Sequence, residues 1–313
     1  MMLRVCVCSL SLSLTASTTD RCSRKPTSAV IVQHNCFGST WLSFLLDSLP
    51  CVQRIRQNGN ADGSFRGSAA SLVEFVTPSA MPEPGLSPCT AAALPGRKLL
   101  PALVNHFISA RRTANRWVVA MLLREPIFAA ICEARKAALA NLARNQTLRC
   151  ANVHHPTAET CPLGLNFSWW QDPEVLYAKW REHEKALLEL AELTAKLATK
   201  LGVPTIATIE YAQLACSRGA LSRELRRALG ERSPASDGAS NATSEKLSPT
   251  NPARAIRNLP EVAALFERRN KTAVARRLLS ANESCAGDDL STIDRRVWRT
   301  LSLVSGTASS ALY

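Results

Sequence analysis

Aromatic residues are scarce in this chain, at 5% of its 313 residues. Proteins that bind single-stranded nucleic acid stack the bases on exposed aromatic side chains. The chain also lacks zinc-finger spacing, a basic region followed by heptads and an aromatic RNA-binding strand motif. We therefore expect no nucleic acid among its partners, although its formal charge is +13. That charge suits another anionic partner, such as an acidic glycan, a membrane surface or a polyanionic nucleotide, and it also fits a solvated basic surface.

Regular cysteine spacing is absent as well. The chain has eleven cysteines, an odd number, and none of them forms a Cys-x-x-Cys pair. The nearest approach to a metal cluster, formed by Cys150, His154, His155 and Cys161, matches no standard zinc spacing. We therefore expect no metal cofactor, and the scattered cysteines allow one or two disulfides without proving them.

An apolar run of membrane-spanning length is missing too. The run from Val5 to Leu14 is shorter than the roughly 20 residues that a spanning helix needs. It resembles a secretory signal, and its alternation of leucine with serine also fits an edge strand. We predict a signal-like or disordered N-terminus over residues 1–25, with membrane anchoring there as an alternative. Five glycosylation sequons favour the secretory pathway or Golgi lumen, with the cytoplasm as the alternative; they begin at Asn145, Asn166, Asn241, Asn270 and Asn282.

One stretch near the N-terminus has the pattern of an anion site. Ala29–Val32 is a short β-branched run that predicts a buried strand, and Trp41–Leu49 is an apolar run that predicts a helix. Between them, Gly38, Ser39 and Thr40 form a turn of small residues. A strand, a glycine turn and a helix together present backbone N–H groups, hydroxyls and a helix N-terminus to a phosphate. The stretch lacks the lysine of a Walker A loop.

This loop resembles the 5′-phosphosulfate-binding loop of the sulfotransferase family. The resemblance covers Cys36, Phe37, Gly38, Ser39, Thr40 and Trp41. Its last four positions match the family pattern, while Cys36 stands where the family has a basic residue. The resemblance implies that these six residues bind 3′-phosphoadenosine 5′-phosphosulfate.

Two later stretches extend the resemblance. Arg116–Glu125 is predicted as a buried strand, and in the family an arginine at this place binds the 3′-phosphate together with a serine eight residues later. Arg124 matches that arginine, and Cys132 stands at the serine position. Thr205–Ile209 is predicted as a further strand, and the helix after it resembles the family's third landmark by ending in Leu229-Gly230. An alternative for Arg124 is a strand-end arginine paired with Glu125.

The resemblance implies an α/β fold: a three-layer, P-loop-like domain with a parallel β-sheet flanked by helices. We expect this domain over residues 26–270, with flexible insertions near 59–96 and 231–254 and a C-terminal tail over 271–313. Apolar periodicity predicts helices over Ile127–Leu142 and Pro173–Leu201.

The implied activity is transfer of a sulfuryl group from 3′-phosphoadenosine 5′-phosphosulfate, without a metal, to an acceptor hydroxyl or amine. The acceptor is expected to be a carbohydrate. The candidate general bases are Glu74 and His34, and a structural role for His34 is the alternative. Two other hypotheses remain open: a catalytically impaired homologue that binds the nucleotide, and a P-loop small-molecule kinase.

A basic run follows residue 267. It comprises Arg268, Arg269, Lys271, Arg276 and Arg277. We predict that this run is a solvated helix face; attraction of an anionic acceptor is the alternative.

Overall fold

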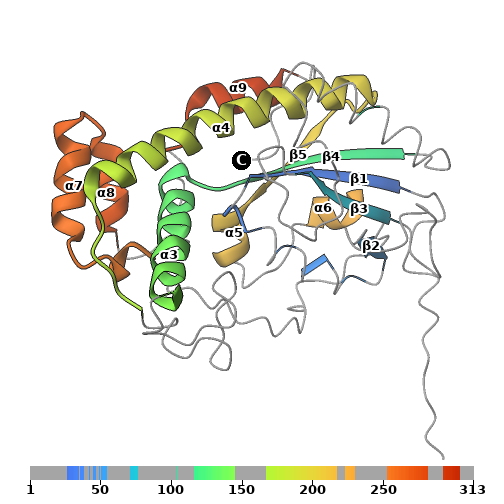
Figure 1. The fold of residues 1–313 in the computed structure, drawn as a ribbon. Coiled ribbons are helices and arrows are strands. Elements are labelled where there is room, and N and C mark those ends of the chain that lie inside the picture. The colour runs from blue at the N-terminus through green and yellow to red at the C-terminus, as the bar shows by residue number, and fades with distance from the viewer. Residues whose placement is uncertain are drawn as a thin grey trace, which may run out of the picture.

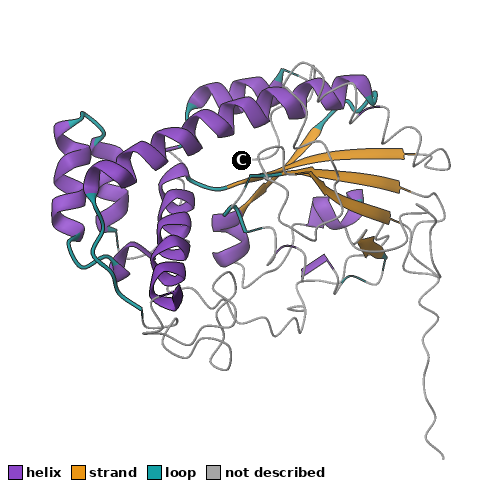
Figure 2. Ribbon diagram, viewed as in Figure 1, coloured by secondary structure: helices purple, strands orange, loops and turns teal. Residues whose placement is uncertain are grey.

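A computed structural model of the chain describes residues 27–34, 36–38, 42, 45–46, 49, 51–54, 71–76, 104, 116–144, 167–216, 223–229, 252–280 and 292–303. Within these residues the chain folds as an α/β protein built on one parallel sheet (Figures 1 and 2). The predicted α/β class with a parallel sheet is therefore confirmed.

Five strands form the sheet in the order β2-β3-β1-β4-β5, and every neighbouring pair is parallel. The strands are β1 (Thr27–Val32), β2 (Val52–Arg54), β3 (Ser71–Val76), β4 (Arg116–Leu123) and β5 (Ile206–Glu210). All of β1 and the last six residues of β4 are buried. This explains why both read as continuous apolar runs, since the strands of a parallel sheet are covered on both faces.

β3 lies inside residues 59–96, where composition indicated a flexible insertion. Its apolar residues, Leu72, Val73, Phe75 and Val76, form a short run among small and polar neighbours. A run this short does not by itself predict a strand. The segment forms β3 because it pairs with β1 along its whole length.

Two helices follow the sequence pattern closely. α3 (Pro126–Arg144) starts directly beyond β4, and α4 (Pro173–Lys200) spans 28 residues. Asp172 caps α4, because its side chain accepts hydrogen bonds from the backbone N–H groups of Glu174 and Val175. Helix α4 is followed by Gly202, whose φ of +66° lies in the left-handed region that glycine tolerates. The predicted helices over Ile127–Leu142 and Pro173–Leu201 are confirmed.

The C-terminal half of α4 covers the sheet. Leu187, Leu190 and Leu197 belong to the same apolar core as the residues of β1 and β4. α9 (Arg295–Ser302) adds Val297 and Leu301 to that core, and it lies beside α4 along the upper side of the sheet in Figure 1.

The N-terminal half of α4 belongs to a second core. There Leu176 and Trp180 pack with apolar residues of α3, Trp169 and the elements that follow residue 251. Those elements are η4 (Pro252–Ala255), α7 (Leu259–Arg268) and α8 (Thr272–Leu279). α8 and α9 thus pack into the two cores although they lie beyond residue 270, where a C-terminal tail was predicted.

Two short helices, α5 (Tyr211–Cys216) and α6 (Arg223–Ala228), follow β5. In the described part of the chain, no helix combines the length and the apolarity needed to cross a membrane. The predictions for residues 1–25 lie outside the described residues, as does most of the predicted insertion at 231–254.

Candidate functional site

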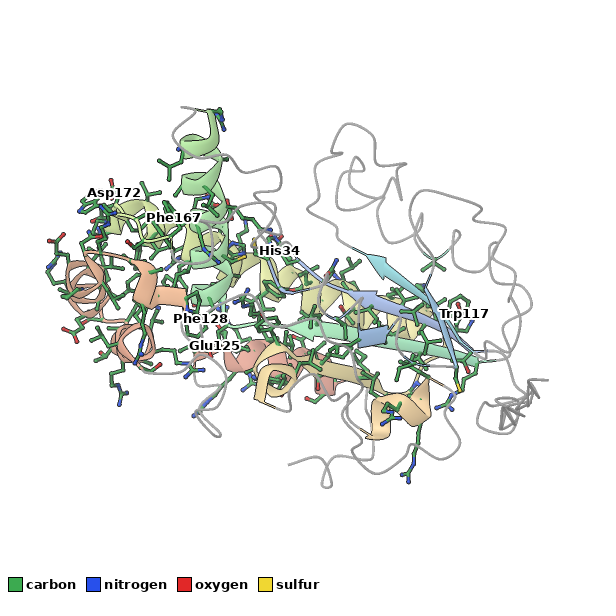
Figure 3. The ribbon with its side chains drawn as sticks, turned by 90° about the horizontal axis from the view of Figure 1, so that it is seen from below. His34, Trp117, Glu125, Phe128, Phe167 and Asp172 are labelled. Carbon is green, nitrogen blue, oxygen red and sulfur yellow. The ribbon has the colours of Figure 1, made fainter. Side chains whose placement is uncertain are left out.

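The site forms where the strand connections diverge. β1 is the central strand; the chain leaves it toward β2 and β3, whereas it leaves neighbouring β4 toward β5. In open parallel sheets, ligands bind outside the carboxyl ends of the strands at such a switch point. Figure 3 places His34 and Glu125 at the end of the sheet near α3, and Trp117 at the opposite end. The residues after β1 and after β4 therefore lie at the same end of the sheet.

Arg124 joins these two connections. Its Nη1 donates a hydrogen bond of 2.7 Å to the carbonyl oxygen of Cys36, 88 residues away in the sequence. Its guanidinium also lies over the ring of Tyr211, 4.3 Å from the centroid. The resemblance assigned the glycine loop and Arg124 to one nucleotide, and the structure brings Arg124 into direct contact with Cys36 of that loop.

Tyr211 fills the space beside the glycine turn. A Cβ placed on Gly38 would lie 2.3 Å from Cδ2 and Cε2 of the Tyr211 ring, so the ring packs directly on the glycine. Gly38 also has φ +97°, a backbone conformation that side chains oppose. The pocket next to Arg124 and Tyr211 is small, with room for about one water molecule. An anion between Gly38 and Arg124 would need the ring of Tyr211 to move.

Cys36 and Cys132 meet on the α3 side of the loop. The thiol of Cys36 donates a hydrogen bond to the sulfur of Cys132, and this bond together with burial raises the pKa of Cys36. Lys136, one helical turn beyond Cys132, hydrogen-bonds Cys36. Burial alone would lower the pKa of Lys136, but the sulfurs of Cys132 and Cys36 outweigh it and raise that pKa. Arg124 and Cys132 thus both contact Cys36, while their joint binding of a 3′-phosphate stays a prediction. Lys136 is a cation that the sequence reasoning missed.

Two histidines pack against each other next to Phe37 of the loop. The ring of His34 meets that of His183 edge-on, with centroids 5.0 Å apart. His183 is 2% exposed, and its Nε2 is 3.0 Å from Oε2 of Glu133, whose other oxygen accepts from Lys179. The hydrogen bonds from His183 and Lys179 outweigh burial and lower the pKa of Glu133 to about 2. A carboxylate only accepts hydrogen bonds, so Nε2 of His183 is the donor in this contact.

The other ring nitrogen of His183, Nδ1, is buried, and it has no hydrogen-bond partner among the described residues. Sequence reasoning missed both His183 and Glu133. A signal for His183 was present, because it occupies an apolar-face position of α4 between Trp180 and Leu187.

Glu125 pairs with Arg277 of α8. Both of its carboxylate oxygens accept hydrogen bonds from Arg277, at 2.6 to 3.0 Å, and Thr292 donates to one of them. Glu125 and Arg277 are buried, so Arg277 is not part of a solvated helix face as predicted, whereas Arg268 and Arg269 are exposed. These hydrogen bonds connect α8 to the end of β4, while Arg124 contacts the loop through Cys36.

The remaining predicted site residues are placed as follows. Phe37 is fully buried and packs against the ring of His34, so it is a core residue of the loop. Glu74 lies within β3, opposite Val30, and its side chain is outside the described part. Ser39, Thr40 and Trp41 lie outside the described residues, within which no cluster of potential metal ligands occurs.

No protein-family model, curated protein or solved structure matches this chain.

Proposed function

We propose that the chain is a sulfotransferase with a three-layer, P-loop-like fold. In this proposal it moves a sulfuryl group from 3′-phosphoadenosine 5′-phosphosulfate to an acceptor hydroxyl or amine, most simply that of a carbohydrate. The observation that carries the proposal is the contact between Arg124 and the loop of Gly38 at the switch point of the sheet. Guanidinium groups bind phosphate through paired hydrogen bonds, and a glycine turn exposes backbone N–H groups to the same anion.

The residues present fit in part a donor that has two anionic groups, the 3′-phosphate and the 5′-phosphosulfate. Arg124 and Lys136 place two cations beside the loop, next to Cys36 and Cys132. A thiol is a weaker donor than the serine hydroxyl at the matching position of the family, so the cations would carry most of the binding free energy. Gly38 admits close approach only when Tyr211 moves away.

Sulfuryl transfer depends on positioning and on charge neutralisation. The acceptor oxygen or nitrogen attacks sulfur, the bond from sulfur to the phosphate oxygen breaks, and the attacking group loses a proton. His34 is our candidate for receiving that proton, because it is half-buried at the end of β1. The ring of His183 lies against that of His34, and Nε2 of His183 is hydrogen-bonded to Glu133, so this chain of contacts holds the His34 ring in place.

A second candidate is a homologue that binds the nucleotide without turnover. The position of Tyr211 favours it, because the ring occupies the space between the glycine turn and the guanidinium. Cys51 is in a disulfide, which suits the secretory lumen expected for a carbohydrate acceptor.

Nucleotide binding tests the shared part of both candidates. We expect 3′-phosphoadenosine 5′-phosphate to raise the melting temperature, since a ligand at 100 times its Kd stabilises a protein by about 2.7 kcal/mol. Arg124→Ala should abolish this shift, and Arg268→Ala, which removes an exposed arginine of α7, should preserve it.

Transfer of labelled sulfate then separates the enzyme from the homologue that only binds. Loss of transfer in His34→Gln with nucleotide binding retained would support His34 as the base. Stabilisation by ATP and magnesium, with none by the 3′-phosphorylated nucleotide, would refute the proposal in favour of a kinase.

A further inference from the structure

Two reduced cysteines meet at the junction between the loop and α3. Neither Cys36 nor Cys132 is in a disulfide; both are half-buried, and they are hydrogen-bonded to each other. The backbone of Cys36 is fixed on its other side by the bond from Arg124 to its carbonyl oxygen. Cys36 also has φ +66°, a conformation that residues with a Cβ adopt rarely, so its neighbours hold it in place.

Cationic side chains lie around the pair. Cys132 interacts electrostatically with Lys136 and Arg135 on its own helix. The hydrogen bond to Cys132 and burial raise the pKa of the Cys36 thiol, so we expect Cys132 to react first. Partly exposed cysteines beside cations are the ones that react with oxidants.

We propose that Cys36 and Cys132 are an oxidation site: a dithiol that a small disulfide, such as glutathione disulfide, converts to an intramolecular disulfide between the loop and α3. The reaction proceeds by thiol–disulfide exchange. The Cys132 thiolate attacks one sulfur of glutathione disulfide, forming a mixed disulfide and releasing one glutathione thiolate. The Cys36 sulfur then attacks that of Cys132, and the second glutathione leaves with the proton from Cys36.

The product covalently links residues that the fold already places together. A disulfide has an S–S distance of about 2 Å, so the two sulfurs must approach each other from hydrogen-bond distance. The link would close a large loop that contains β2, β3 and β4, and it would hold Cys36 against α3. The site does not depend on the identity of the donor or acceptor in the proposed function.

Mass spectrometry of the full chain tests this inference. The reduced protein is incubated with mixtures of glutathione and glutathione disulfide, free thiols are blocked with N-ethylmaleimide, and the chain is cut with trypsin and chymotrypsin. Cleavage after Trp41 separates Cys36 from Cys51, which is in a different disulfide. We expect a cross-linked peptide pair carrying Cys36 and Cys132, lost after reduction.

Serine variants assign the two roles. Cys36→Ser should accumulate a stable glutathione adduct on Cys132, because the second exchange cannot occur, and Cys132→Ser should leave Cys36 unmodified. Serine is close to cysteine in size, and matching melting temperatures of the reduced proteins would confirm that both variants fold. Absence of the cross-link at full oxidation, or a lasting glutathione adduct on Cys132 of the unmutated chain, would overturn the proposal.

Discussion

The contact between Gly38 and Tyr211 predicts that a single methyl group at position 38 will disrupt the site. The Cβ of Gly38→Ala would lie 2.3 Å from two ring carbons of Tyr211. The ring cannot easily turn away, because Tyr211 is buried and the guanidinium of Arg124 lies on its face. The new methyl group therefore either displaces the ring or shifts the loop.

Two effects add to the expected cost. The backbone at Gly38, with φ +97°, costs about 1–3 kcal/mol for a residue that has a Cβ. Overpacking against the ring costs about a further 1–3 kcal/mol. We expect Gly38→Ala to lower the free energy of unfolding by about 2–6 kcal/mol in total.

A double-mutant cycle separates these effects. Tyr211→Ala removes the ring, so in that background Gly38→Ala should cost only the backbone part, and the coupling between the two sites should be about 1–3 kcal/mol. Gly202→Ala is the matched control, because Gly202 also has positive φ but a Cβ there would contact nothing within 4 Å. The assay is urea unfolding with equal m-values across the variants. Additive costs, or equal costs for Gly38→Ala and Gly202→Ala, would refute the packing argument.

Three further predictions follow from other contacts. Arg277→Ala should destabilise the fold by about 3–5 kcal/mol in urea unfolding, because it leaves Glu125 buried without its cation; a smaller loss in the double variant Glu125→Leu/Arg277→Met would confirm the cause, and an equal one would contradict it. The pKa of Glu133 is held near 2, below its ordinary value of 4.5, so its contribution is present above that value and is lost as the pH falls toward 2. Its side chain is 40% exposed, so we expect about 1–2 kcal/mol, measured as the difference in pH dependence between the unmutated chain and Glu133→Gln; identical curves would contradict it. Asn270 is exposed in its sequon, so in a secretory host Asn270→Gln should reduce the mass removed by an N-glycosidase by one glycan, and no change would contradict glycosylation there.

The elements that local pattern predicts are those with long apolar periodicity. β4 and α4 agree with their predicted ranges within about two residues, as expected for strongly periodic segments. β3 was missed because its apolar residues are few and the strand is formed by pairing with β1, which the local sequence does not show. The same limit applies to Arg277, whose partner Glu125 is 152 residues away.

At the candidate site, the sequence alone determined which chemical groups the chain carries and where they fall on local elements. The glycine turn after a buried strand and the arginine at the end of another follow from residue order, because strands and turns depend on neighbouring residues. Only the tertiary structure decided that Cys36 meets Cys132, that Tyr211 fills the space beside Gly38 and that His183 lies between His34 and Glu133. Those contacts join residues from different elements, and they form because the parallel order of the strands brings the ends of β1, β4 and β5 to one edge of the sheet.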